Sequence, residues 1–175
     1  MTAELSARER GGNLLSFLPA QIREPRRPAL ALVVAWLLTY PASILLAALV
    51  SLLIPGVAQP QFNVSGHVAL FLLVVFAPVI ETLIMGGVLL VLLRLVSPGV
   101  AILLSSLGWG IAHSLGAPTW GLVIWWPFLI FSTLFVTWRQ RSLTLAFAMP
   151  MLAHALHNLP TALIVAYFPH LITTQ

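Results

Sequence analysis

Four polar side chains stand out because they lie inside long apolar stretches of the chain. Glu81 is near the middle of the run from residue 67 to residue 95, and it is the only acidic residue after Glu24. A carboxylate in the middle of a membrane span costs a few kcal/mol to insert, so it usually faces the protein interior and has a function. The other three are His113, His154 and Asn158, in the apolar stretches that follow. The sequence therefore indicates a buried polar site, provided that these side chains meet.

Together, these residue types suit the hydrolysis of a peptide bond by an activated water molecule. A buried carboxylate can act as the general base that removes a proton from water. An imidazole and a side-chain amide on another helix can donate hydrogen bonds to the developing oxyanion, usually the largest catalytic contribution in acyl transfer. This chemistry needs no covalent intermediate. The candidate catalytic residues are Glu81, His113, His154 and Asn158.

Other hydrolytic chemistries fit the sequence less well. The chain has no Asp and no Cys, which excludes an aspartyl pair and a thiol nucleophile. It has no His-Glu-x-x-His zinc motif and no Gly-x-Ser-x-Gly nucleophile elbow. We expect no cofactor, but zinc stays open, because Glu81, His113 and His154 with one water would form a catalytic zinc ligand set.

The composition predicts a membrane protein. Of the 175 residues, 60% are hydrophobic and only 7% are charged, whereas soluble domains carry about 25% charged residues. The basic residues are all Arg and flank the apolar stretches, as the positive-inside rule requires. We therefore expect contact with a lipid bilayer and none with nucleic acid. The absence of Lys hints at a prokaryote, and thus at a multi-pass protein of the cytoplasmic (inner) membrane.

Hydropathy and turn residues predict an all-α, polytopic bundle of about five transmembrane helices. Residues 1–28 are expected to be a cytosolic N-terminal tail without further function, and residues 29–168 an integral membrane domain with its core motifs at 70–165. With the N-terminus in the cytoplasm, all eight Arg fall on the cytoplasmic side. The predicted spans are 28–54, 67–95, 100–115, 119–138 and 143–168.

This topology places the polar residues at one depth. Glu81 and His154 each lie 13 residues from an arginine at the inner end of their segment, and His113 lies 15 residues after Pro98. At 1.5 Å per residue, each is about 20 Å from the inner interface, and Asn158 is about 6 Å further out. We therefore predict that three helices bring these groups into one site.

Local spacing supports the same prediction. His154 and Asn158 are four residues apart and share one helix face, which His157 borders. Pro78 and Pro150 each precede a site residue by about one turn, and each frees a backbone carbonyl in the preceding turn. Small residues let helices approach closely, so we expect the second and third spans to pack tightly through their glycines. These are Gly86, Gly87, Gly108 and Gly110.

The stretches IETLIMGG, LGWGIAHSLG and PMLAHALHNLP resemble the motifs of the CAAX prenyl protease and bacteriocin-processing (CPBP) family. The resemblance implies an intramembrane endopeptidase in which Glu81 and His113 activate water, while His154 and Asn158 bind the oxyanion. Members have been described as metalloproteases and as metal-free glutamate-type proteases. We favour the latter because Asn158 is a poor zinc ligand. The chain departs from the family pattern at Thr82 and Gly86, where Glu and Arg are usual.

The expected function is thus a glutamic-type intramembrane protease acting on a membrane-anchored or membrane-embedded peptide. A prenylated tail, a bacteriocin leader and a C-terminal sorting helix are all open as substrates. Two other functions stay open. The chain could be a non-catalytic relative that acts as a membrane chaperone or immunity protein, or a small transporter subunit that uses Glu81 as a proton site.

Overall fold

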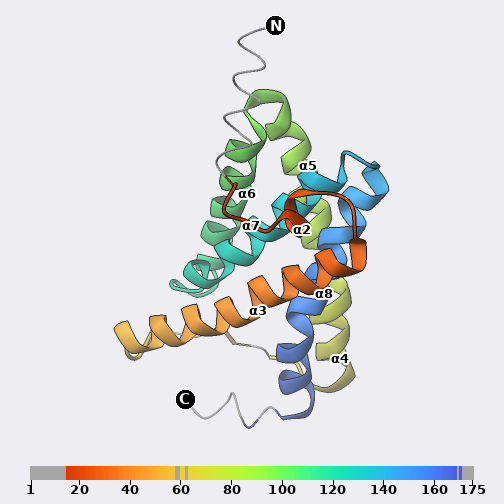
Figure 1. Ribbon diagram of the computed structural model, residues 1–175. Helices are drawn as coiled ribbons and strands as arrows, with labels where there is room; N and C mark the ends of the chain where they lie inside the picture. Colours follow the sequence, from red (N-terminus) through yellow and green to blue (C-terminus); the bar gives the residue numbers. More distant parts are fainter. Residues whose placement is uncertain (1–14, 58–59, 62, 169, 171–175) are drawn as a thin grey trace, which may run out of the picture.

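The computed structural model describes residues 15–57, 60–61, 63–168 and 170, and within these residues the protein is all-α (Figure 1). A four-residue helix precedes five longer helical segments, the second of which is formed by α4, η1 and α5 in succession. The elements are α2 (Ala20–Arg23), α3 (Pro28–Leu53), α4 (Gly66–Leu70), the π-helical turn η1 (Phe71–Phe76), α5 (Ala77–Leu95), α6 (Pro98–Ser114), α7 (Gly121–Trp138) and α8 (Leu143–Tyr167).

The helix starts follow from residue types in the sequence. Pro28 and Pro98 occupy the first turns of α3 and α6, where a missing N–H costs nothing and the fixed φ suits a helix. Ser142 caps α8, because its hydroxyl oxygen accepts a hydrogen bond from the Leu145 N–H at 3.1 Å. The observed bounds therefore lie within a few residues of the five predicted segments.

The second segment is continuous from residue 66 to residue 95, but its register changes on the way. In η1 the hydrogen-bond pattern is that of a π-helix, and the N–H of Ala77 donates to the carbonyl of Leu72, five residues earlier. Such turns are rare and often occur at functional sites. Here the π turn lies directly before the part of α5 that carries Glu81.

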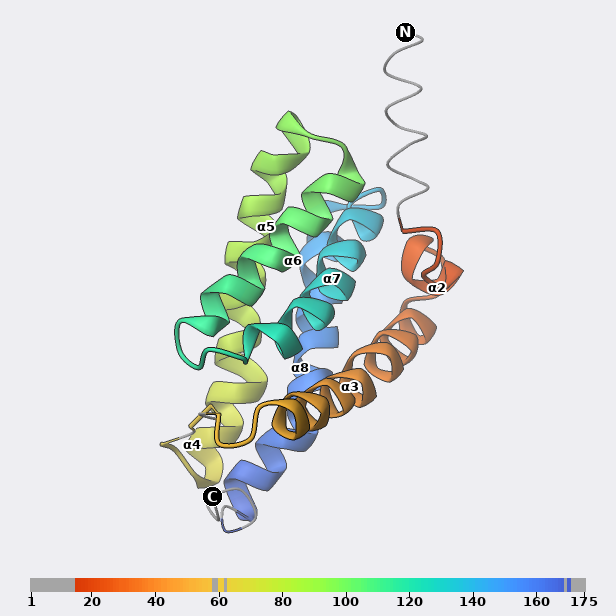
Figure 2. The same ribbon diagram turned by 90° about the vertical axis from the view of Figure 1, so that its left-hand side faces the viewer.

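Helix α7 is the most buried of the long helices and forms the centre of the bundle. Its side chains Ile130, Phe131, Leu134 and Phe135 are almost fully buried. Helices α3, α6 and α8 all pack against it, and α4 and η1 run beside α8 (Figures 1 and 2). The cavity described below lies where α3, α5, α6, α7 and α8 approach one another.

The outer surface is that of a membrane protein. Three helical segments among the described residues are long and apolar enough to cross a bilayer: Pro28–Leu53, Gly66–Leu95 and Gly121–Trp138. Their outward side chains include strongly exposed leucines such as Leu45 and Leu52, as expected for a surface that meets lipid. The total of five spans and the cytoplasmic N-terminus stay predictions.

The prediction that the second and third spans pack tightly against each other through their glycines was wrong. A Cβ at Gly87 or Gly108 would meet nothing within 4 Å. Gly110 instead lies against Gly121 at the start of α7, and Gly86 lies against the rings of Phe135 and Phe147. The close contacts of these glycines therefore join α6 to α7 and α5 to α7 and α8, and none of the four glycines joins α5 closely to α6.

The described part of the N-terminal tail is packed against the bundle. Leu15, Leu18 and Ile22 are buried in the main hydrophobic core, and α2 contacts α7. Phe17 stacks with Trp126 at a ring separation of 6.5 Å. This part of the tail is therefore packed against the helical bundle. The cytosolic location of residues 1–28 stays a prediction.

Candidate active site

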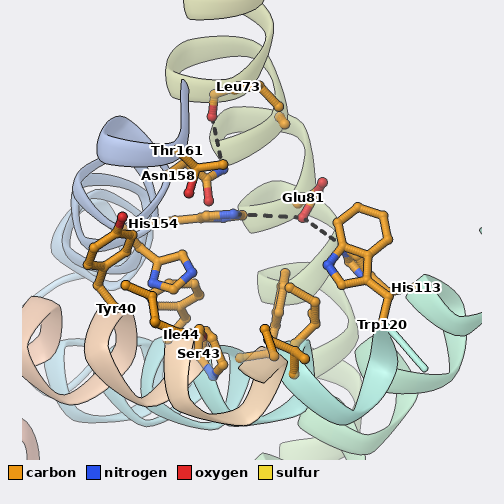
Figure 3. A pocket seen from close by; sticks show the side chains of 18 residues that line it. Tyr40, Ser43, Ile44, Leu73, Glu81, His113, Trp120, His154, Asn158 and Thr161 are labelled. Carbon is orange, nitrogen blue, oxygen red and sulfur yellow. Dashed lines mark hydrogen bonds and ion pairs between the residues drawn. The ribbon is translucent and has the colours of Figure 1, made fainter. Parts of the chain in front are cut away.

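A cavity of about 260 Å³ opens between α3, α5, α6, α7 and α8 (Figure 3). One water needs only ~10–15 Å³, so the cavity has room for part of a larger ligand. Its wall is mainly apolar and aromatic, with polar groups from α3, α5, α6 and α8. The polar and aromatic lining includes Tyr40, Ser43, Glu81, His113, Trp120, Phe128, Phe131, His154, His157, Asn158 and Thr161.

Glu81 lies between two histidines that come from different helices. Its Oε2 is 4.0 Å from Nε2 of His113 on α6 and 3.9 Å from Nε2 of His154 on α8 (Figure 3). These separations are longer than a direct hydrogen bond, and polar groups at such distances are commonly bridged by water. The Glu81 side chain is 25% exposed, so a molecule in the cavity can reach it.

The ring of His113 is held by its own helix and by aromatic neighbours. Its Nδ1 lies 2.9 Å from the carbonyl oxygen of Trp109, one turn earlier. The ring of Trp120 meets it edge-on at 4.9 Å, and Phe128 lies at 5.7 Å. Since a carbonyl only accepts, Nδ1 carries the proton, and in the neutral ring Nε2 is an acceptor facing Glu81.

The ring of His154 has different surroundings. It stacks on Phe131 at 4.9 Å with an interplanar angle of 24°, and Phe128 meets it edge-on at 5.5 Å. Only 5% of the residue is exposed. Its Nδ1 is buried and has no hydrogen-bond partner in the described part of the chain. Packing, not hydrogen bonding, therefore orients this imidazole, and its Nε2 edge points toward Glu81 (Figure 3).

Asn158 lies one helical turn beyond His154 on α8, and its side-chain amide reaches the preceding segment. Its Nδ2 donates to the carbonyl oxygen of Leu73 in η1 at 2.9 Å. A side-chain amide has two N–H donors, so this bond leaves a second N–H on the same nitrogen. The bond also joins α8 to the segment that carries Glu81 (Figure 3).

The four residues chosen from the sequence thus line one cavity, as their common depth predicted. Their catalytic roles stay predictions. Sequence reasoning placed His157 only at the border of the site, and it missed Thr161, Tyr40 and Ser43, which also line the cavity. The helical spacing of residues 154, 157, 158 and 161 could have indicated the α8 members. Nothing in the sequence indicates which part of α3 crosses the site.

The cavity does not fit a metal ion well. No group of three or more His, Cys, Asp or Glu side chains within the described residues is arranged to hold one. A metal-bound histidine almost always donates its other ring N–H to an acceptor, but Nδ1 of His154 has no partner among these residues. The Asn158 amide is engaged with Leu73. We therefore assign no step of peptide-bond hydrolysis to a metal ion.

The two departures from the family motif have a packing explanation. Thr82 is 1% exposed and lies outside the cavity lining. A Cβ at Gly86 would already lie 2.7 Å from a ring carbon of Phe135 and closer still to Phe147. An arginine at position 86 therefore has no room unless both rings move. In this chain, aromatic packing occupies the space beside α5 where the family pattern has a charged side chain.

Comparison with family models gives one match. Residues 63–160 match the model described as type II CAAX prenyl endopeptidase Rce1-like. No curated protein and no solved structure matches the chain. The matched range covers more than half of the chain and contains all four candidate catalytic residues. It confirms the resemblance seen in the motifs: the chain belongs to the Rce1-like family of CAAX prenyl endopeptidases, a family of membrane proteases.

Proposed function

We propose that the chain is a glutamic-type intramembrane endopeptidase that cleaves a membrane-associated peptide with an activated water molecule. The observation that carries this proposal is the position of Glu81 Oε2, 4.0 Å from His113 Nε2 and 3.9 Å from His154 Nε2. Asn158 lines the same cavity. Glu81 and His113 can activate the water molecule, and His154 and Asn158 can bind the oxyanion.

Water activation is assigned to Glu81 and His113. Two acceptors 4.0 Å apart can both be reached by one water molecule with hydrogen bonds of about 2.8 Å. The Trp109 carbonyl keeps the proton of His113 on Nδ1, so Nε2 accepts one water hydrogen while Glu81 accepts the other. Glu81 then takes the proton as the water attacks the scissile carbonyl, and it returns this proton to the leaving nitrogen when the C–N bond breaks. His113 acts mainly by orienting that water.

Oxyanion binding is assigned to His154 and Asn158. Nδ1 of His154 is buried and has no acceptor in the described part of the chain. We therefore assign the proton of the neutral ring to Nε2, at the edge that faces the cavity. The second N–H of the Asn158 amide is also available as a donor. Preorganised donors of this kind in a low-dielectric site stabilise the tetrahedral intermediate strongly.

The cavity supports an apolar peptide segment as the substrate. Much of its wall is apolar, from Val123, Ile124, Phe128 and Phe131, and no Arg side chain among the described residues lines it. The family model favours a prenylated C-terminal tail. A bacteriocin leader and a C-terminal sorting helix have similarly apolar segments and are kept as alternative substrates.

The test is cleavage of internally quenched peptides by the full chain in lipid nanodiscs, with one peptide for each of the three substrate classes. Glu81→Gln keeps the shape of the side chain but removes the base, so we expect kcat to fall by roughly 10²–10⁴-fold. Leu83→Ala is a matched control, because Leu83 is exposed on the same helix.

Each contrary result has a clear meaning. Full cleavage by Glu81→Gln would overturn the assignment of Glu81 as the base. If the folded wild type cleaves no peptide of the panel, the non-catalytic function is favoured. Loss of cleavage on treatment with a chelator, restored by zinc alone, would favour the metalloprotease alternative.

A further inference from the structure

The carbonyl of Leu73, which accepts the Asn158 amide, lies inside a continuous helix, where the helix itself normally supplies the donor. In an α-helix the donor to residue 73 would be the N–H of Ala77, and in a π-helix it would be the N–H of residue 78. The N–H of Ala77 donates to Leu72 instead. Residue 78 is proline, which has no N–H.

We propose that Pro78 is a positioning residue that keeps the Leu73 carbonyl free to hold Asn158. This inference rests on the proposed function, in which the second N–H of Asn158 binds the oxyanion. Pro78 is fully buried and lies one turn before Glu81 on the same helical segment. The hydrogen bond from Asn158 to Leu73 therefore joins the proposed oxyanion donor to the helical segment that carries the proposed base, Glu81 (Figure 3).

The π turn and the proline are both needed for this effect. In an uninterrupted α-helix, Pro78 would leave the carbonyl of residue 74 without a donor. That carbonyl lies about 100° further around the helix axis than the carbonyl of residue 73. Because the hydrogen bonds of Phe71–Phe76 have π register, the carbonyl that lacks a donor from position 78 is that of Leu73. Leu73 is also the residue whose carbonyl accepts from Asn158 at 2.9 Å.

The hydrogen bond can be followed directly, without an activity assay. The chain has three Asn, at positions 13, 63 and 158, so a sample labelled with ¹⁵N-asparagine has three side-chain amide nitrogens with two protons each, and Asn158→Ala identifies the pair of signals of interest. We expect the proton donated to Leu73 to exchange slowly with solvent in the wild type and at least tenfold faster in Pro78→Ala. The new N–H of that variant competes for the Leu73 carbonyl. Pro41→Ala, an exposed proline in α3, should leave the signal unchanged.

Activity gives the second readout. With whichever peptide the wild type cleaves, Pro78→Ala should lower kcat on the order of 10²-fold with little change in KM, as expected for a misplaced oxyanion donor. The double variant Pro78→Ala/Asn158→Ala should cleave no more slowly than Asn158→Ala alone. Pro78→lactic acid, introduced by nonsense suppression, differs from alanine chiefly in lacking the N–H. It should therefore recover most of the lost rate.

The outcomes separate this inference from the proposed function. If Pro78→Ala exchanges and cleaves like the wild type, or if alanine and lactic acid at position 78 behave alike, Pro78 does not act through the Leu73 carbonyl. If the amide signal responds as expected but the wild type cleaves no peptide, the positioning of Asn158 holds and its assignment to proteolysis fails.

Discussion

At the scale of single residues, the cavity wall divides into side chains that reach Glu81 and side chains that do not. His113 and His154 approach its Oε2 within 4.0 Å. His157, on the same helix as His154, instead meets Tyr40 edge-on at 6.0 Å and Phe131 at 5.9 Å. Two neighbouring histidines of α8 thus have different partners, and their replacement should have different consequences.

We expect Asn158→Ala to lower kcat by roughly 10²–10³-fold, because it removes one of the two proposed oxyanion donors. His157→Ala should have a much smaller effect on kcat, since its contacts are with aromatic rings at the α3 and α7 side of the cavity. Steady-state cleavage by both variants, with circular dichroism as the check of folding, measures the difference.

The same pair of variants distinguishes a protease from a transporter. A proton-coupled transporter needs the carboxylate of Glu81 but no oxyanion donor. It would therefore keep its transport activity in Asn158→Ala. Equal losses of kcat in Asn158→Ala and His157→Ala would contradict the assignment of Asn158, and not His157, as an oxyanion donor. Such a result would indicate that both residues act only through packing.

At the scale of helices, α6 and α7 approach each other very closely where Gly110 meets Gly121. A Cβ at Gly121 would collide with the carbonyl oxygen of Gly110 and with the hydroxyl of Ser114. A backbone carbonyl cannot rotate away as a side chain can, so the helices would have to separate. His113 lies on α6 beside this contact, and the packing of α6 on α7 therefore sets how far its ring reaches toward Glu81.

Gly121→Ala should accordingly destabilise the protein by about 1–3 kcal/mol, the usual range for overpacking. Gly108→Ala is the matched control on α6, because a Cβ there meets nothing within 4 Å. It should be neutral or slightly stabilising, since alanine favours helix more than glycine does. The fluorescence of the six Trp during denaturation in mild detergent follows unfolding. A Gly121→Ala protein as stable as the control would contradict the close contact.

The sequence was most informative where the residue and its immediate neighbours determine the structure. Pro28, Pro98 and Ser142 mark helix starts, and a carboxylate in an apolar run has to face inward. The sequence was least informative where the partner lies far along the chain. Gly86 packs on Phe135 and Phe147, and Tyr40 enters the cavity from α3, contacts that no local spacing specifies. The π turn was also missed, because FLLVVF has no pattern that separates it from an α-helix.

At the scale of the whole molecule, the elements that carry arginine gather at one end of the bundle. Arg94 lies in the last turn of α5, and Arg139 caps α7. The α5–α6 turn and the α7–α8 turn both lie at this end, while α4 and the end of α8 lie at the other (Figures 1 and 2). From the positive-inside rule we therefore predict that the end of the bundle with the arginines is cytoplasmic.

The absence of Cys allows this orientation to be tested with single cysteines and a membrane-impermeant maleimide on intact cells. Ser65 and Ser97 flank the segment that carries Glu81, and neither side chain caps its helix, so Ser65→Cys and Ser97→Cys should fold normally. We expect labelling at position 65 in intact cells, and labelling at position 97 only after the cells are opened. The opposite pattern would invert the orientation, since residues 66–95 form one continuous helical segment.

A third cysteine tests the number of spans. Gln140 is exposed in the turn between α7 and α8, and two helices, α6 and α7, separate it from Ser97. If both cross the membrane, Gln140→Cys lies on the same side as Ser97→Cys and is protected in intact cells. α6 has 17 residues, about 25 Å at 1.5 Å per residue, slightly less than the ~30 Å hydrocarbon core. Labelling of Gln140→Cys in intact cells would mean that only one of α6 and α7 crosses. Because α7 is a candidate span and α6 is not, this result would contradict the depth calculated for His113.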